Sequence, residues 1–572
     1  MDDGRAASSA RSRPAGLAAE LLLVNGMVRT VDRSLPRASA IAIKDGRIIA
    51  VGDDRIVRET KGPRTETIDL GGRTVVPGFQ DAHAHPSQAG LERSRCDLSE
   101  LHGRDAYLER IAGYAAAHPD AVWILGGGWS MDVFPAGIPT KDDLDRVVWD
   151  RPVFLPSRDG HSAWVNSRAL EVAGIDAATP DPVDGRIERD ETGEPVGTLQ
   201  EGAMDLVRRV SPPPSLEEVI AGILDAQRYL HSLGVTAWQE AIVGRAAAGA
   251  DCFDAYLALD ASGRLTGKVV GALWWERGTG ERQLETLLAR REQASGCSHF
   301  KASTVKFMQD GVCENFTASM LEPYLDVSGH ATSNSGKSFF DPEELKRYVT
   351  LVDAHGFQAH FHAIGDRAVR EVLDAVEAAR NENGPADNRH CAAHLQVVHP
   401  EDVARFARCG LTANGQPLWA CNEPQMVELT IPFLGPERSA RQYPFGSLVR
   451  SGSRLCFGSD WPVSTPDVMA QIHVAVNRTQ PPGQAPGADG DRSSHDEPFL
   501  PTERVDLETA LAAFTAGSAY VNHLEDETGS ITVGKRADLV VLDRDPFASP
   551  LGEIGTVGVD LVFADGALVH GA

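Results

Sequence analysis

Residues 215–241 read SLEEVIAGILDAQRYLHSLGVTAWQEA and join a helix-type pattern to a strand-type pattern. Apolar residues recur at helical spacing as far as a stop at Gly234, and the run from Val235 is typical of a buried strand. The next strand-like runs, KVVGALWW from residue 268 and STVKFMQDG from residue 303, follow at intervals of about 33 to 35 residues, which accommodate one strand, one helix and two loops. The pattern predicts βα units and a parallel sheet.

Five further strand-like runs extend this pattern along the chain. They are TVVPGFQDAHAH (74–85), FQAHFHAIGD (357–366), HCAAHLQVV (390–398), LTANGQP (411–417) and SRLCFGSDWP (453–462). Eight parallel strands with helices between them predict an α/β fold of the (β/α)₈ TIM-barrel type.

The remaining segments predict a second, smaller domain. Residues 20–77 and 528–572 are both β-rich and rich in Asn-Gly, Asp-Gly and Gly-Gly turns, so we expect the two chain ends to pair into one small β-sandwich. The barrel then spans 78–527. An insertion at about 90–232 is too long for one connection and is expected to cover the barrel mouth. Residues 1–19 are small, polar and charged and predict a disordered tail.

Composition excludes some functional classes. The chain has 572 residues, 42% of them hydrophobic, and a formal net charge of −26. Such a charge argues against nucleic acid or an anionic membrane as a partner. No run approaches the roughly 20 apolar residues of a membrane span. Eight scattered cysteines without a CxxC pair predict a reducing, cytoplasmic location.

Ionisable side chains lie at the predicted strand ends, where barrels of this type carry their reactive groups. They are His83 and His85 in the first strand, Lys306 in the fourth, His362 in the fifth, His394 in the sixth and Asp460 in the eighth. An H-x-H pair alone also occurs in ordinary loops, and it is the matching set that favours a metal site. Histidines two apart on a strand project to the same side, and imidazoles and a carboxylate suit zinc or a similar divalent ion.

Lys306 needs a separate explanation, because an ammonium group between cations would be repelled. Read alone, it would be a surface or salt-bridged lysine. A buried lysine with a lowered pKa offers a free amine, which could react with carbon dioxide to give a carbamate that bridges two metals.

The sequence resembles the amidohydrolase superfamily, specifically the amidohydrolase-3 (YtcJ-like) group that includes N-substituted formamide deformylases, over nearly its whole length. The matching pieces, in chain order, are VVPGFQDAHAHP, GHSAWVNSRAL, VKFMQDG, HAIGDRAV, CAAHLQVVHP, GSDWPV and GSITVGKRADLVVLD. The sixth-strand motif of the family usually reads Glu-His-Ala-Gln, whereas residues 393–396 read Ala-His-Leu-Gln. The ligand is retained there and its neighbours differ.

The resemblance implies a binuclear metal centre, with zinc the expected metal. In the family pattern His83 and His85 bind one ion with Asp460, His362 and His394 bind the other, and Lys306 bridges them as N6-carboxylysine. His362 is preferred to His360 because it adjoins the Ala-Ile-Gly-Asp match, and His360 is expected to be structural.

This centre predicts hydrolysis of a small-molecule amide. Two metals sharing a water make hydroxide available near neutral pH, and Asp460 would carry the water's proton to the leaving nitrogen. An N-formyl or other N-acyl amine is the expected substrate. His161 is the first choice for a contact to the carbonyl or oxyanion. Further expected substrate contacts are Trp129, Trp164, Asn166, Gln416, Trp419 and Trp461.

Other functions remain open at this point. A deaminase or a carbamate, lactam or ester hydrolase of the same superfamily is the nearest alternative, although deaminases typically use one metal and lack the lysine bridge. A non-catalytic scaffold is the remote alternative, since such relatives usually lose ligands. By resemblance alone, a homodimer or larger homo-oligomer is also expected.

Overall fold

The computed structural model describes residues 18–244, 251–483 and 497–571, and its largest sheet is the predicted barrel. The strand order is β21-β20-β19-β18-β17-β16-β15-β8, and the hydrogen-bonded neighbours are parallel. The strands are β8 (Phe79–Ala84), β15 (Val235–Val243), β16 (Lys268–Trp274), β17 (Phe300–Met308), β18 (Gln358–Ala363), β19 (Cys391–His394), β20 (Thr412–Gly415) and β21 (Leu455–Phe457). Each overlaps one of the eight predicted runs, so the predicted fold class is confirmed.

The barrel closes between β21 and β8 through single contacts. The backbone N–H of Asp460 donates to the carbonyl of His83 at 2.7 Å, and the N–H of Ser459 donates to Asp81 Oδ1 at 3.0 Å. Gly458 lies so close to β8 that a Cβ there would stand 2.4 Å from the His83 nitrogen, which only glycine avoids. This closure places Asp460 directly beside His83.

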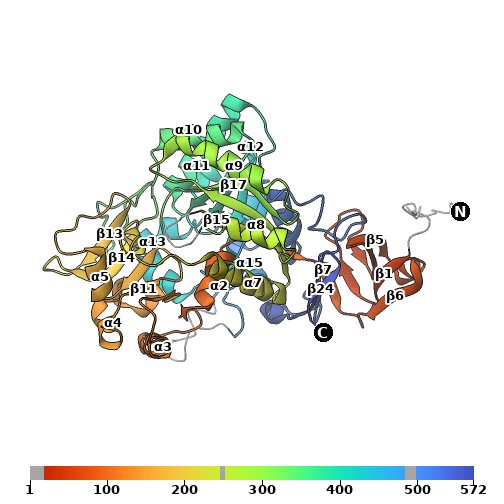
Figure 1. Ribbon diagram of the computed structural model, residues 1–572. Helices are drawn as coiled ribbons and strands as arrows, with labels where there is room; N and C mark the ends of the chain where they lie inside the picture. Colours follow the sequence, from red (N-terminus) through yellow and green to blue (C-terminus); the bar gives the residue numbers. More distant parts are fainter. Residues whose placement is uncertain (1–17, 245–250, 484–496, 572) are drawn as a thin grey trace.

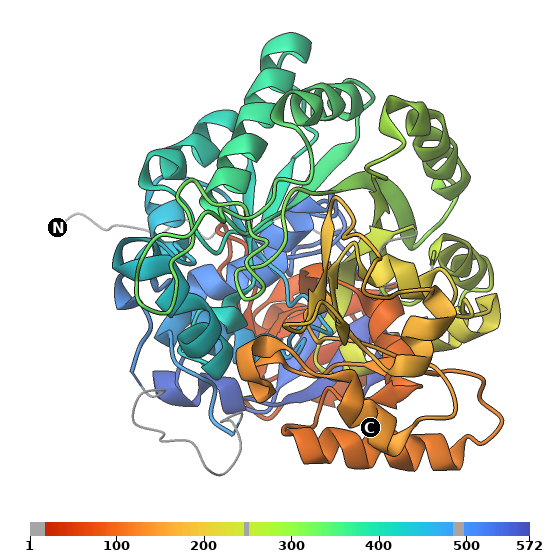
Figure 2. The ribbon, with the colours of Figure 1, turned by 90° about the vertical axis from the view of Figure 1, so that its left-hand side faces the viewer.

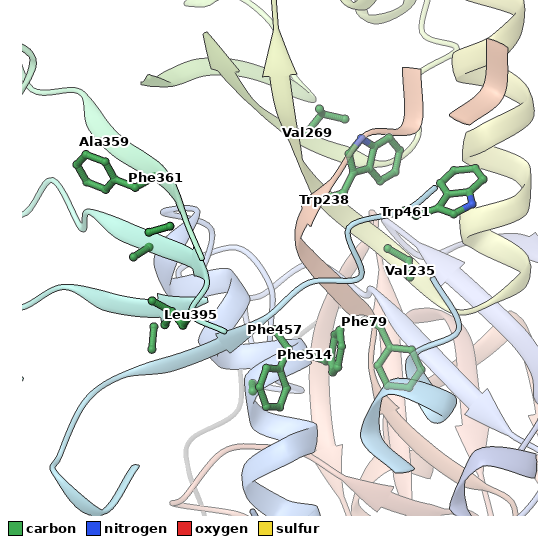
Figure 3. Packing of buried hydrophobic residues seen from close by; sticks show 14 of the residues in the cluster. Phe79, Val235, Trp238, Val269, Ala359, Phe361, Leu395, Phe457, Trp461 and Phe514 are labelled. Atoms are coloured by element: carbon green, nitrogen blue, oxygen red, sulfur yellow. The ribbon is translucent and has the colours of Figure 1, made fainter. Parts of the chain in front are cut away.

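Helices surround the barrel and seal its core. α7 (Leu216–Ser232) begins at a capping box, in which Ser215 and Glu218 satisfy each other's backbone N–H groups. The other helices that flank the barrel strands are α8 (Phe253–Ala261), α9 (Leu284–Ala294), α10 (Pro342–Ala354), α11 (Asp366–Asn383), α12 (Pro400–Cys409) and α15 (Val468–Asn477). Figure 3 shows Phe79, Trp238 and Phe361 among the buried hydrophobic side chains of the main core cluster.

Both chain ends build the small β domain at one end of the barrel (Figure 1). One sheet has the order β24-β23-β22-β7-β2-β3, and a second sheet of four strands has the order β5-β4-β1-β6. The strands are β1 (Ala19–Val24), β2 (Met27–Arg29), β3 (Arg37–Ala38), β4 (Ala40–Lys44), β5 (Arg47–Gly52), β6 (Lys61–Asp69), β7 (Thr74–Pro77), β22 (Leu539–Leu542), β23 (Val559–Ala564) and β24 (Ala567–His570). Residues 1–17 of the predicted tail lie outside the described residues.

A buried lysine connects the barrel to the small β domain. Lys268, the first residue of β16, places its ammonium 2.9 Å from Asp538 and 2.8 Å from Asp565. Burial lowers the pKa of Lys268, but the two carboxylates outweigh burial and raise it. Burial raises the pKa of Asp565, but His299 and Lys268 reverse this and lower it. The bridge therefore stabilises the fold across neutral pH: the Lys268 contribution fades only in strong alkali and the Asp565 contribution only in acid.

We expect Lys268→Met to destabilise the protein by about 3 kcal/mol, because it leaves the fully buried Asp538 carboxylate without its cation. Denaturant titration monitored by circular dichroism measures the change. Lys346→Met serves as the control, since its ion pair with Glu343 is exposed and such pairs contribute less than about 1 kcal/mol. Equal effects of the two substitutions would show that the bridge does not hold the domains together.

The insertion forms its own layer over the opposite end of the barrel, in front of the strands in Figure 2. Its sheet has the order β13-β14-β12-β11-β10-β9. The strands are β9 (Cys96–Asp97), β10 (Ile124–Gly127), β11 (Val153–Pro156), β12 (Ser162–Val165), β13 (Gly185–Arg189) and β14 (Pro195–Glu201). α2 (Pro86–Arg93) leads into it from β8, and α3 (Arg104–Ala117), α4 (Lys141–Val147) and α5 (Ser167–Ala173) pack on it. Among the described helices, none is long and apolar enough to cross a membrane.

Candidate metal centre and active-site cavity

The six predicted metal ligands converge at the barrel mouth, because parallel strands present their carboxyl ends at the same side. Asp460 lies at the centre of the group, with Oδ1 3.3 Å from His83 Nε2 and 3.0 Å from His85 Nε2. Its Oδ2 is 3.9 Å from His394 Nδ1, and ligand atoms of His83, His394 and Asp460 lie within 4.8 Å of one another. Buried imidazole and carboxylate atoms at such distances can bind a common cation.

Lys306 and His362 complete the cluster. The Nζ atom of Lys306 lies 3.5 Å from His83 Nε2, and the ring of His362 lies 4.4 Å from that of His394. Lys306 is 2% exposed, and burial lowers its pKa to about 8, against the opposing charges of Asp460 and Cys391. A free amine is therefore accessible near neutral pH, as carbamate formation requires.

The protonation states of the cluster suit metal binding. Burial, followed by the neighbouring positive charges, lowers the pKa values of His83, His362 and His394 well below the ordinary histidine value. Burial raises the pKa of Asp460, but the contact with His85 and the charge of nearby Lys306 help to outweigh burial and lower it. The group thus offers neutral imidazoles and an ionised carboxylate. His394 Nδ1 and Asp460 Oδ1 are buried without a hydrogen bond, and a divalent ion would satisfy both.

The backbone is strained where two of these ligands sit. His394 and Asp460 have φ values of 80° and 58°, in the left-handed region that residues other than glycine rarely adopt. Such strain persists only where the surrounding structure enforces it, and it concentrates at functional sites.

Further polar residues orient the ligands. Asp310 accepts from His362 Nδ1 at 3.2 Å and from the N–H groups of Ile364 and Gly365. Gln416 accepts from the N–H of His394 at 2.8 Å. Asp310 was missed as a site residue, although it lies in the stretch VKFMQDG that carried the resemblance.

His360 belongs to this supporting set. Its Nε2 lies 2.7 Å from His83 Nδ1, and its Nδ1 lies 3.4 Å from Cys391 Sγ. A metal ligand needs a lone pair on His83 Nε2, so the ring proton of His83 must be on Nδ1. This Nδ1–H group then donates a hydrogen bond to His360 Nε2. His360 therefore selects the metal-binding tautomer of His83.

We expect His360→Phe to weaken binding of a divalent metal about tenfold or more, because His83 loses the acceptor that fixes its tautomer. Titration of the metal-free chain with Co²⁺, followed by absorption spectroscopy, measures the affinity. His390→Phe is the matched control, since that histidine is also buried but pairs with Asp353. Unchanged Co²⁺ affinity in a folded His360→Phe variant would contradict the role of this contact.

His161 faces the cluster from the insertion. Its ring lies 5.3 Å from that of His362, and its Nδ1 lies 2.9 Å from Glu201 Oε1. Burial alone would lower the pKa of His161, but the Glu201 carboxylate outweighs it and raises that pKa to about 9. Glu201 in turn accepts from Thr317 Oγ1 at 2.7 Å. Glu201 could not be identified from the sequence, because its strand belongs to the insertion.

A cavity of about 540 Å³ adjoins the cluster. Trp419 lines it and stacks on His394 with 5.2 Å between ring centres and 13° between planes. Trp461, which follows Asp460 in the chain, and Ile364, two residues after His362, also line it. The cavity thus lies next to the predicted ligand residues, and aromatic side chains wall it on that side.

Three other expected substrate contacts have structural roles instead. Trp129 and Trp164 pack in the core of the insertion, where their ring nitrogens donate to the carbonyls of Leu155 and Thr140. Asn166 caps α5 and bonds to three backbone groups of neighbouring segments. Their side chains are buried inside the insertion and do not line the described cavity.

Comparison with known proteins agrees with this architecture. The chain is 32% identical over 537 residues to protein LONG AFTER FAR-RED 3 of Arabidopsis thaliana, covering 92% of this chain and 88% of that protein. It is 28% identical over 574 residues to N-substituted formamide deformylase of Arthrobacter pascens, covering 96% of this chain and 98% of that protein. An uncharacterized metal-dependent hydrolase from Pyrococcus furiosus has a similar structure, with a TM-score of 0.68 and 27% identity. The match covers 92% of this chain and 99% of that chain.

A family model decides the classification. The model of the amidohydrolase family termed Amidohydro_3 matches residues 66–570, which include strands β7, β22, β23 and β24 of the small β domain as well as the barrel and the insertion. With its barrel, its buried His/His/Asp cluster and this match, the chain belongs to the Amidohydro_3 amidohydrolase family.

Proposed function

We propose that the protein hydrolyses an N-acyl amine to a carboxylic acid and an amine. The observation that carries the proposal is the convergence of the six predicted metal ligands at the barrel mouth, beside a cavity and facing His161. A relative at 28% identity is named N-substituted formamide deformylase, which supports an N-formyl group as one form of the substrate.

The residues present fit two divalent ions. His83, His85 and Asp460 would hold one ion, and His362 and His394 the other, with Lys306 bridging them once it is carboxylated. Zinc suits this mixed nitrogen and oxygen set. When bound, such ions make hydroxide available near neutral pH and polarise a carbonyl oxygen.

Protein side chains would supply the remaining chemistry. Asp460 takes the proton of the attacking water at its carboxylate and delivers it to the leaving nitrogen, so that the C–N bond breaks to give a neutral amine. His161, held by Glu201 through Nδ1, directs Nε2 at the substrate carbonyl and donates a hydrogen bond to its developing negative charge. The insertion above the mouth shields these steps from bulk water.

We expect removal of divalent metal by a chelator to abolish hydrolysis of N-formyl and N-acetyl amines, and zinc to restore it. Amine release measures the activity, and elemental analysis gives the metal content. The proposal fails if the zinc-loaded chain hydrolyses no compound in a broad panel of amides, carbamates, lactams and esters.

The metal content separates the two enzymatic alternatives. About two ions per chain agree with the Lys306 bridge and with amide hydrolysis. One ion per chain, with ammonia released from an aminated ring, would replace the proposal by deamination.

A further inference from the structure

The cavity beside the metal cluster is strongly acidic. Six carboxylate residues line it, against two arginines. The carboxylates are Glu92, Asp97, Glu100, Asp159, Glu314 and Glu423. One of the arginines, Arg93, is already engaged, since it pairs with Asp225 at 2.8 Å and lies over the ring of Tyr229. The cavity therefore favours a positively charged occupant.

Within the described part of the chain, none of these six carboxylates forms an ion pair with a lysine, arginine or histidine. The Glu423 side chain forms no hydrogen bond there either. Glu314 accepts from the hydroxyl of Thr430 at 3.0 Å. Burial, and then the charges of Asp132 and Glu314 against that of Arg158, raise the pKa of Glu423 to about 8. A cation between Glu314 and Glu423 would remove this repulsion.

A buried tyrosine provides an independent indication of a ligand. Tyr443 lines the same cavity and is 2% exposed, and its hydroxyl has no hydrogen-bond partner among residues 18–244, 251–483 and 497–571. The side chain is thus held by its surroundings, while the hydroxyl is free to bind an occupant of the cavity. Burial raises the pKa of Tyr443, and the charges of Glu314 and Glu423, which line the same cavity, add to this effect.

The cavity walls complete a site for an organic cation. Trp419, Trp461 and Tyr229 contribute aromatic groups to the lining. Aromatic faces attract ammonium groups, and carboxylates bind them through charge-assisted hydrogen bonds. Because Trp419 stacks on the metal ligand His394, the same cavity can hold one end of a molecule whose other end lies at the metal cluster.

We propose that the substrate is an N-acyl amine that carries a second, positively charged nitrogen, and that Glu423, Glu314 and Tyr443 hold this cation. The inference rests on the proposed amide hydrolysis and specifies its substrate class. Arg158 also lines the cavity and forms no ion pair within the described segments. It would favour an anionic group instead, so the probes include a carboxylate.

Binding of uncleavable probes tests the inference without turnover. The probes are methanesulfonamides of linear amines with three to six methylene groups, ending in an ammonium, a hydroxyl or a carboxylate group. Isothermal titration calorimetry with the zinc-loaded full chain measures their affinities. We expect the best ammonium probe to bind about tenfold or more tightly than its hydroxyl counterpart, and to release a proton from Glu423, so that the heat at pH 7 depends on the buffer.

Two test variants and one control show which residues bind the ammonium group. Glu423→Gln is expected to remove most of the preference for the ammonium probe and to leave the hydroxyl probe unchanged. Glu100→Gln is the matched control, because this residue lines the same cavity but is exposed to solvent, where an ion pair contributes little. Tyr443→Phe, which removes only the hydroxyl, should reduce the preference to an intermediate value.

The outcomes separate this inference from the proposed function. Equal affinities of the ammonium and hydroxyl probes for the wild-type chain, or tighter binding of the carboxylate probe, overturn the cationic substrate whatever the enzyme hydrolyses. A clear ammonium preference that Glu423→Gln abolishes supports the site even before a substrate is found. N-formyl and N-acetyl versions of the same compounds should then show the same order in kcat/KM.

Discussion

Asp460→Asn is expected to lower kcat/KM for N-acyl amine hydrolysis about a thousandfold. The carboxylate contacts both His83 and His85, and its lowered pKa keeps it in the ionised form that a proton acceptor requires. An amide of the same shape can still offer an oxygen to a metal, but it cannot take a proton from water and deliver it to the leaving nitrogen. The loss should therefore appear in kcat, with much of the metal retained.

Steady-state kinetics and elemental analysis of the same Asp460→Asn preparations check this expectation. Asp467→Asn is the control, because Asp467 caps α15 through its side-chain oxygen and asparagine can make the same hydrogen bonds. Activity within tenfold of wild type in a metal-loaded Asp460→Asn variant would assign the proton transfer to another group.

Lys306→Met is expected to remove about one metal ion per chain and to reduce activity about a thousandfold. Methionine fills the space of the buried lysine but cannot form a carbamate, so the bridging carboxylate is lost. In Lys306→Ala, which leaves room for a small carboxylate, added formate or acetate should restore part of the activity. Lys301→Met, at an exposed position of the same strand, should change neither quantity.

Carbon-13 NMR gives a direct view of this modification. Protein prepared with labelled bicarbonate should show a carbamate resonance that is missing from Lys306→Met. Two bound ions and full activity in Lys306→Met, or no carbamate signal in a fully active wild-type sample, would show that Lys306 does not serve as a ligand in this form.

The barrel could be predicted from the sequence because its strands are covered on both faces. Such strands appear as continuous apolar runs, as in β18, whose six residues are all buried. The helices between them have their own stop signals, such as the glycine after α7. The ligand residues followed from the same register, since each lies at a strand end where chemistry is expected in this fold.

The insertion could not be predicted in the same way. Its strands β12 and β14 pair antiparallel although a long segment separates them in the chain, and no sequence period sets that register. The pairing is what places Glu201 beside His161. Tryptophan is common both in ligand pockets and in hydrophobic cores, so the sequence cannot assign Trp129 and Trp164 to either. Only the packing of the insertion shows that both are core residues.

His360 shows a further limit. It stands two residues before His362 on a strand, so alternation alone would direct both rings to the same side. The resemblance selected His362, but only the positions of His83 and Cys391 reveal that His360 contacts the predicted ligand His83.

The pairing of β7 with β22 joins segments that are synthesised far apart in time. Val75 and Val76 lie opposite Val541 and Val540, so the central ladder of this sheet cannot form until the last part of the chain has left the ribosome. Throughout translation β7 exposes an unpaired edge directly next to the first barrel strand, and such edges promote aggregation. The nascent chain therefore carries this open edge from the synthesis of β7 until β22 has emerged.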